Sequence, residues 1–241
     1  MKVVVESINN QIVSDYCFKG WLGATNLDHD VKLLSLSGAS MIQNQLKKER
    51  PMPIGSVYYM KYFFDLYDII CPKPLNIHKV VPDVHEDWKE VKGINNILNY
   101  PRFVKPLNEV KKFTGFVAKS IKDFELYPEV ENWDGELLTC KPFEFKIQSE
   151  WRCFIHEDKI INISCYSGDS LYFPIPNEIE QLIKLYSDYA PVAYTLDFAV
   201  SSEGITKFIE ANDMWAIGPY GCKEEDYFTM LKDRWNEIIR Q

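Results

Sequence analysis

Two stretches near the carboxyl end of the chain, YTLDFAV (194–200) and ITKFIEAN (205–212), alternate apolar and polar side chains as β-strands do. The four residues between them, SSEG (201–204), predict the loop of a hairpin. With a four-residue loop, residue 200 pairs with 205 and residue 196 pairs with 209. Because side chains alternate along a strand, this register predicts one apolar face. Its members are Leu196, Phe198, Val200, Ile205 and Ile209.

The other face of the predicted hairpin carries oxygen-bearing side chains, namely Asp197, Glu210 and Asn212. In the predicted register Asp197 and Glu210 are diagonal neighbours, roughly 7–8 Å apart at the backbone. Magnesium takes oxygen ligands from one or two carboxylates together with phosphate oxygens. The hairpin therefore predicts a metal–nucleotide site. The alternative is a polar strand face that meets water, which is the commoner fate of acidic residues on strands.

The first third of the chain reads as an α/β unit. Strands are expected at 2–6 and 31–37, and a helix at 39–48. Three prolines between residues 71 and 83 then predict a linker or a domain boundary.

The rest of the chain mixes helices with strands that pair locally. Helices are expected at 88–100, 178–189 and 224–239, and the middle one buries Ile179, Leu182, Ile183 and Tyr186. Strands are expected at 102–105, 115–118 and 137–140, followed by a hairpin of 150–156 with 159–166. This order of elements predicts an α+β protein with antiparallel strands in its later part.

Composition narrows the class of protein. The 241 residues are 46% hydrophobic and 26% charged, which is typical of a soluble globular chain. A net charge of 27 − 35 = −8 disfavours a nucleic-acid partner. No stretch is long and apolar enough for a membrane helix or a signal peptide, so we expect no membrane and a cytoplasmic location. The six cysteines and four histidines lack zinc-ligand spacing, which favours reduced thiols.

Six phrases together resemble the ATP-grasp superfamily of carboxylate–amine ligases. The closer resemblance is to a small phage and bacterial clade recognised by two arginines and a lysine, and it covers most of 51–221. The phrases are PIGSVYY (53–59), FVKP (103–106), KKFTG (111–115), SEWRCFI (149–155), YTLDFAV (194–200) and FIEANDMWAIGPYG (208–221).

The resemblance implies an ATP-grasp fold, in which two α+β subdomains grip a nucleotide. A small N-terminal α/β domain at 1–80 would precede the ATP-grasp domain at 81–241. Within the latter, about 101–138 would form a small lid and 139–241 the metal-binding core.

The same resemblance assigns roles around ATP and magnesium. Asp197, Glu210 and Asn212 would bind the metal, and Lys105 would reach the phosphates. Lys111 or Lys112 would close over them. The family spacing favours Lys111, and the doubled lysine leaves the choice open.

Arg152 is the basic residue with the clearest context, because it alternates with apolar neighbours in the middle of a predicted strand. Such an arginine is either paired or ligand-binding. The resemblance makes it a phosphate or acyl-phosphate contact with a catalytic role alongside Lys105. The alternative is a structural ion pair, for example with Glu150.

The segment LLTCKPFEF (137–145) resembles the hinge whose backbone binds adenine, at Cys140, Lys141 and Phe143. Many family members carry an acidic residue where Cys140 stands, so the choice of nucleotide stays open. Glu150 resembles the position that holds the ribose hydroxyls. Ser56 and Tyr220 resemble substrate contacts, although Gly55–Ser56 is equally typical of an ordinary turn.

The implied reaction is an ADP-forming ligation through an acyl phosphate, with an amino acid, peptide or protein as substrate. The alternative is a catalytically idle ATP-grasp fold that serves as a nucleotide-binding or inhibitor protein. Other nucleotide enzymes fit poorly. A polynucleotide ligase needs lysine in K-x-D-G, where this chain has Asn132 before Trp-Asp-Gly. The P-loop and protein-kinase motifs are missing from the sequence.

Overall fold

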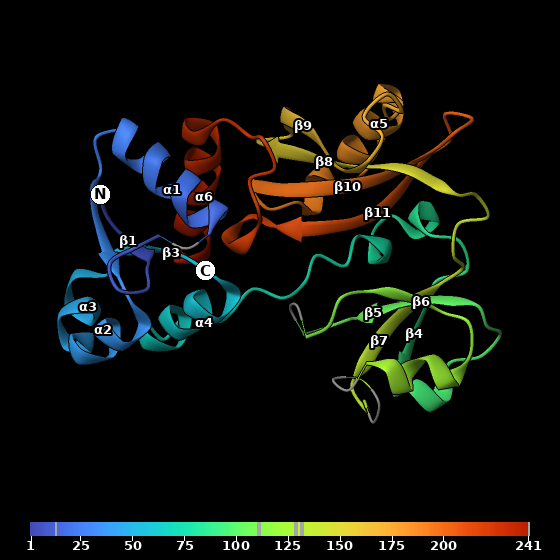
Figure 1. The fold of residues 1–241 in the computed structure, drawn as a ribbon, viewed down its shortest axis with the longest axis horizontal. Helices are drawn as coiled ribbons and strands as arrows, with labels where there is room; N and C mark the ends of the chain where they lie inside the picture. Colours follow the sequence, from blue (N-terminus) through green and yellow to red (C-terminus); the bar gives the residue numbers. More distant parts are fainter. Residues whose placement is uncertain (13, 110–111, 128–129, 131–132, 241) are drawn as a thin grey trace.

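The computed structural model describes residues 1–12, 14–109, 112–127, 130 and 133–240. Within them three separate sheets form, each with its own apolar cluster (Figure 1). The helices and strands are β1 (Lys2–Glu6), α1 (Asp15–Asn26), β2 (Asp30–Leu34), α2 (Leu36–Met41), α3 (Gln43–Glu49), β3 (Met52–Ile54), α4 (Val57–Leu66), β4 (Lys89–Lys92), β5 (Arg102–Pro106), β6 (Phe116–Ala118), β7 (Glu136–Cys140), β8 (Ile147–His156), β9 (Lys159–Gly168), α5 (Pro176–Tyr186), β10 (Ala193–Ser201), β11 (Thr206–Asp213) and α6 (Glu224–Ile238).

The first sheet is parallel, in the order β2-β1-β3, and we call it and the helices α1 to α4 and α6 the N-terminal lobe. The expected helix at 39–48 is two helices, α2 and α3, which meet at Ile42. The expected strand at 31–37 ends at Leu34, because Ser35 caps α2 by accepting a hydrogen bond from the Gly38 N–H.

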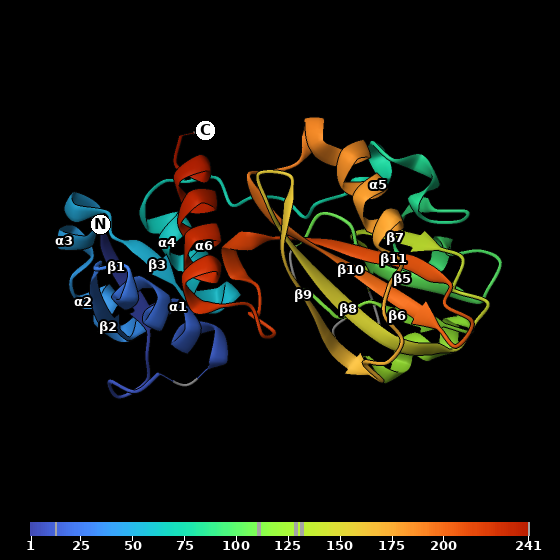
Figure 2. The same cartoon turned by 90° about the horizontal axis from the view of Figure 1, so that it is seen from above.

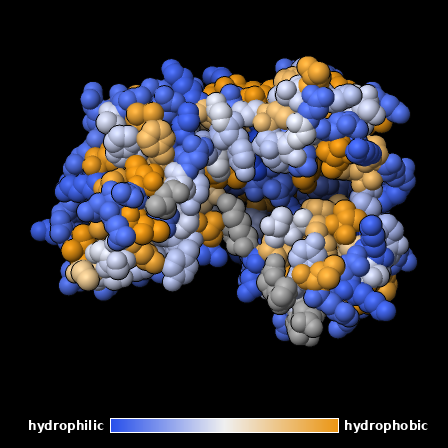
Figure 3. Space-filling model, in the orientation of Figure 1, coloured by the Kyte–Doolittle hydropathy of each residue, from blue (hydrophilic) through white to orange (hydrophobic). Residues whose placement is uncertain are grey.

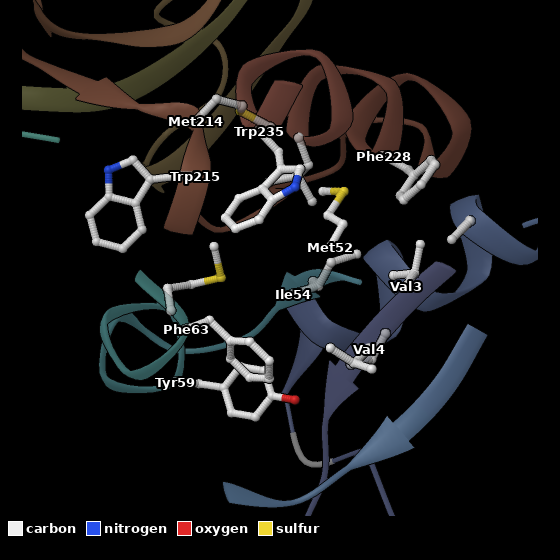
Figure 4. Packing of buried hydrophobic residues seen from close by; sticks show 14 of the residues in the cluster. Val3, Val4, Met52, Ile54, Tyr59, Phe63, Met214, Trp215, Phe228 and Trp235 are labelled. Carbon is white, nitrogen blue, oxygen red and sulfur yellow. The ribbon is translucent and has the colours of Figure 1, made fainter. Parts of the chain in front are cut away.

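The last helix of the chain belongs to the core of the N-terminal lobe. Trp235 of α6 points toward Met52 of β3, and Phe228 points toward Val3 of β1 (Figure 4). The two chain ends consequently lie in the same lobe (Figure 1). The sequence placed α6 with 139–241, but the apolar face of this helix is buried against the N-terminal lobe instead.

The second sheet is small, and its order is β4-β7-β5-β6. The helix predicted over 88–100 is wrong, since β4 pairs with β7 and Gly93 then adopts a φ of +73° before a short 3-10 turn. Strand pairing with a distant segment prevailed over local helical spacing. The small sheet therefore begins at Lys89, before the predicted lid boundary of 101.

The third sheet is large and antiparallel, in the order β11-β10-β8-β9. Helix α5 covers one of its faces (Figure 2). As predicted, the buried side of α5 carries Ile179, Leu182, Ile183 and Tyr186. The opposite face of this sheet is left for the site described below.

The predicted register of the β10–β11 hairpin is wrong near its loop. Val200 pairs with Thr206, because the Ser201 N–H bonds to the Ile205 carbonyl and the Ser201 side chain accepts from the loop amides. A β-bulge at Ile209 then adds one residue, and Asp197 lies directly opposite Glu210. Accordingly Phe208 joins Leu196 and Phe198 in the apolar cluster, whereas Ile205 is 40% exposed.

The two register shifts have opposite consequences for the polar face. A shift of one residue alone would send Glu210 and Asn212 to the other side of the sheet. The bulge restores their side, so Asp197, Glu210 and Asn212 still share one face. Among the described residues, no helix is long and apolar enough to cross a membrane.

Replacing Gly23 of α1 by alanine should destabilise the protein. A Cβ at this position would lie 2.1 Å from the Glu224 carbonyl oxygen and 2.7 Å from the Phe228 Cβ, so α1 and α6 would be forced apart. We expect the melting temperature, measured by circular dichroism, to fall by roughly 3–10 °C. Thr25→Ala, at an exposed position of the same helix, is the control and should leave it nearly unchanged. An unchanged melting temperature for Gly23→Ala would contradict the close packing of these helices.

Candidate functional site

A cavity of about 610 Å³ lies between the small sheet and the face of the large sheet that α5 does not cover. In the space-filling view the molecule is hollowed between these two parts, and hydrophilic side chains gather around the hollow (Figure 3). The linker before the small sheet supplies Lys73, Pro74 and Leu75. The small sheet and its loop supply Lys105, Pro106, Glu109, Lys112, Phe113, Thr114 and Gly115. The large sheet and the segment after it supply Arg152, 210–213, 215–218 and Tyr220.

Arg152 and Asp197 form a buried ion pair across β8 and β10, where they are direct neighbours. The Arg152 Nε donates to Asp197 Oδ1 at 2.8 Å, and its Nη2 donates to Oδ2 at 2.6 Å. Burial raises the pKa of Asp197 to about 6, against the lowering effect of the guanidinium. At neutral pH the carboxyl is therefore ionised and holds Arg152 by two charge-assisted bonds.

The expected structural alternative for Arg152, a pair with Glu150, is not what forms. Glu150 instead accepts a hydrogen bond from the Tyr166 hydroxyl at 2.8 Å. Arg152 is thus paired and, at the same time, part of the cavity wall. Its remaining guanidinium N–H groups are the ones that a ligand can use.

Two tyrosines lie over the guanidinium of Arg152. The Tyr220 ring centroid is 4.7 Å from the Arg152 Cζ, and the Tyr166 centroid is 5.5 Å away. Tyr220 has a φ of +36° and Gly221 a φ of +84°, so a left-handed turn brings this segment back over the sheet. A Cβ on Gly221 would meet the Ser164 hydroxyl at 3.2 Å. The rings limit the movement of Arg152 and shield it from water.

Glu210, Asn212 and Lys105 lie close together on the cavity wall. The Asn212 Nδ2 donates to Glu210 Oε1 at 3.0 Å, and the Lys105 Nζ lies 3.8 Å from Glu210 Oε2. Lys105 comes from β5 of the small sheet and Glu210 from β11 of the large one. This ion pair therefore spans the cavity between the two sheets.

The donor geometry fits a magnesium ion. Neighbouring ligands in an octahedron with Mg–O bonds of about 2.1 Å are about 3 Å apart. Rotating the Asn212 side-chain amide by 180° would exchange the positions of its Nδ2 and Oδ1. The Asn212 Oδ1 would then lie 3.0 Å from Glu210 Oε1. Asp197 uses one lone pair of each oxygen for Arg152 and retains the others.

Among the described residues, no group of three or more His, Cys, Asp or Glu side chains is arranged to hold a metal ion. Magnesium commonly binds one or two carboxylates and takes its other ligands from water and phosphate. Glu210 and Asn212 offer one carboxylate and one amide oxygen for such a set of ligands.

Lys112 lines the cavity, and its Nζ lies 5.4 Å from the centroid of the Trp133 ring. Lys111 lies outside the described residues, so the choice between the two lysines stays open.

The predicted nucleotide-base contacts do not line this cavity. Cys140 is buried at the end of β7, and burial raises the pKa of its thiol to about 11. Lys141 is paired with Glu86 and Glu144. The segment does connect the small sheet to the large one, as a hinge would. Adenine binding at Cys140, Lys141 and Phe143, and ribose binding at Glu150, stay predictions.

The two predicted substrate contacts differ in position. Tyr220 lines the cavity. Ser56 caps α4 in the N-terminal lobe by accepting from the Tyr59 N–H, and its hydroxyl and amide donate to Glu6. Ser56 therefore lies in a turn, as the alternative had it, and this turn caps a helix.

Four charged residues in or beside the site were missed from sequence, namely Lys73, Glu109, Asp213 and Arg234. Lys73 lines the cavity from the linker. Its position between two prolines was the only feature of the sequence that could have singled it out. Asp213 follows Asn212 directly and forms an ion pair with Arg234 of α6. Nothing in the sequence links these two residues, because the pair depends on where α6 packs.

Several solved structures, two of them of ligases, share this fold. A D-alanine–D-alanine ligase from Bacillus anthracis is 15% identical, with a TM-score of 0.54 over 99% of this chain and 97% of that one. An L-amino acid ligase from Bacillus licheniformis is 11% identical, with a TM-score of 0.57 over 96% of this chain and 74% of that one. A RimK domain ATP-grasp protein from Sphaerobacter thermophilus is 12% identical, with a TM-score of 0.58 over 96% and 99%. At such identities these matches establish the fold alone.

No curated protein matches the chain by sequence. A family model described as ATP-grasp domain, R2K clade family 2, matches residues 84–230, which is more than half of the chain. This span contains both sheets that enclose the cavity. The α+β fold expected from the sequence is confirmed, and the chain belongs to this ATP-grasp family.

Proposed function

We propose that the protein is an ATP- and magnesium-dependent ligase that joins a carboxylate to an amine and releases ADP. The observation that carries the proposal is the composition of the cavity walls. Lys105 and Lys112 come from the small-sheet side, whereas Arg152, Glu210 and Asn212 come from the large sheet. A triphosphate between two sheets needs cations on both sides and oxygen ligands for its metal.

In this proposal the triphosphate lies between Lys105, Lys112 and Glu210. The base extends toward the hinge at 140–143, outside the cavity lining. Support for ATP as the nucleotide comes from the family, and the Bacillus anthracis ligase has also been solved as a complex with ATP. Asp197, Glu210 and Asn212 would hold magnesium, which when bound neutralises phosphate oxygens.

The proposed reaction has two steps. A carboxylate oxygen attacks the γ-phosphorus of ATP, the bond to the bridging oxygen breaks, and ADP leaves. The amine nitrogen then attacks the carbonyl carbon of the acyl phosphate, a C–N bond forms, inorganic phosphate leaves, and the nitrogen loses a proton.

The protein's part in both steps is positioning and charge neutralisation, and no side chain needs to act as a nucleophile. Arg152 would bind the transferred phosphoryl group through the N–H groups that Asp197 does not use. Lys105 would be drawn from Glu210 toward the phosphates, where the negative charge is greater.

The substrates proposed are an amino acid, a peptide or a protein chain end. Two proteins of the same fold are named as ligases of D-alanine and of L-amino acids, which supports an amino-acid carboxylate and an amine. Tyr220 lies where the second substrate would meet the cavity edge, and Ser56 stays a predicted contact.

Adding ATP and magnesium together should raise the melting temperature of the protein, because only the folded state binds them. At a ligand concentration 100 times the Kd, the gain is about 2.7 kcal/mol, or roughly 5–10 °C. Thermal-shift measurements with ATP in EDTA provide the control and should give a much smaller shift. The absence of any shift at millimolar MgATP would rule out the nucleotide site.

Glu210→Gln should abolish ADP formation with little effect on folding, because the amide keeps the shape of the side chain and removes the charge that holds a metal. The assay is ADP release during a screen of amino acids and peptides. Glu203→Gln, in the loop of the same hairpin, is the matched control and should retain turnover. Equal turnover by Glu210→Gln and wild type would place the metal elsewhere. MgATP binding without turnover on any substrate would favour the idle fold.

A further inference from the structure

Helix α6 is tied to the end of β11 by a second buried ion pair. The Arg234 Nε donates to Asp213 Oδ1 at 2.8 Å, and its Nη2 donates to Oδ2 at 2.6 Å. The two side chains are only 6% and 5% exposed. Burial raises the pKa of Asp213, against the lowering effect of Arg234. The pair thus repeats the two-bond geometry of Arg152 and Asp197 at the other edge of the site.

The same arginine also reaches the start of β10. Its Nη1 donates to Glu237 Oε2 at 2.7 Å. Glu237 in turn accepts a hydrogen bond at 3.1 Å from the N–H of Val192, the residue before β10. Arg234 therefore anchors the beginning of one strand of the hairpin and the end of the other.

Asp213 connects the anchored end of β11 to the cavity wall. It directly follows Asn212, and it accepts a hydrogen bond from the backbone of Trp215, which starts the cavity-lining segment 215–218. Neighbouring side chains of a strand point to opposite faces. Fixing the Asp213 carboxylate therefore fixes the peptide plane before it and directs Asn212 toward Glu210.

We infer that Arg234 is a positioning residue for the proposed nucleotide site, acting through Asp213 on Asn212 and on the segment 215–218. The inference rests on the proposed function for the ligand that the site takes. It goes beyond the family assignment, because the family match ends at residue 230. Because α6 is part of the core of the N-terminal lobe, the inference also means that this lobe holds the end of β11, the strand of Glu210 and Asn212, in place.

The competing interpretation is that the pair only holds α6 in place. A purely structural pair would lower stability when it is weakened and would leave the magnesium requirement of ATP binding unchanged. A positioning pair would raise the magnesium concentration that ATP binding needs, since partners that orient a metal ligand typically change metal affinity by roughly 10- to 100-fold.

The test uses Arg234→Lys in the full chain, because lysine keeps the charge opposite Asp213 and loses the two-pronged geometry. A second variant, Arg234→Met with Asp213→Leu, removes both charges and leaves neither buried alone. The control is Lys19→Met. It removes the 3.0 Å ion pair between Lys19 of α1 and Glu224, which lies on α6 as Arg234 does. Each protein is titrated with magnesium at fixed ATP in a thermal-shift assay, and backbone hydrogen exchange is measured without ligand.

We expect Arg234→Lys to raise the half-saturating magnesium concentration about tenfold or more and to speed exchange across 208–217. The double variant should behave likewise, and Lys19→Met should match the wild type in both measurements. A magnesium requirement within about twofold of wild type, or unchanged exchange at 208–217, would overturn the inference.

A wild-type protein without any MgATP response would defeat the proposed function instead. The exchange measurement would then test the anchoring alone: unchanged exchange at 208–217 would refute it, and faster exchange there would leave only the structural interpretation of the pair.

Discussion

The bidentate pair between Arg152 and Asp197 is the interaction on which the rest of the site depends. Both charges are almost completely out of water, and each would cost several kcal/mol if it were alone. Two short bonds between direct cross-strand neighbours on the central strands β8 and β10 offset that cost. The pair therefore allows a buried cation in the middle of the sheet, with part of its guanidinium facing the cavity.

Other features of the site follow from this pair. Because Asp197 holds Arg152 and Asp213 holds Arg234, Glu210 is the cavity carboxylate of the hairpin that Lys105 approaches from the small sheet. Because Arg152 is shielded by Tyr166 and Tyr220, the segment after β11 must turn back over the sheet. Charge, aromatic packing and the left-handed turn at Tyr220 are consequences of placing one arginine in this position.

The prediction that Asp197, Glu210 and Asn212 share one face was right although the predicted register was not. The loop was longer by one residue than the sequence suggested, and the bulge at Ile209 compensated for it. Side-chain alternation on β10 is a local property and could be predicted from the sequence. Loop length and bulges could not, because they depend on hydrogen bonds such as those of Ser201. The wrong helix at 88–100 has the same origin, because the pairing of β4 with β7 is not a local property.

The sequence by itself determined the element types with strong periodicity, the apolar side of α5, the family, and the three polar side chains that share a face of the hairpin. These depend on residues a few positions apart. Only the tertiary structure decided that Arg152 pairs with Asp197, 45 residues away, and that Arg234 pairs with Asp213 across the lobe boundary. It also decided that Lys73, Lys105 and Glu210 share one cavity. The reason is physical: strand order and helix docking bring distant residues together, and neither leaves a period in the chain.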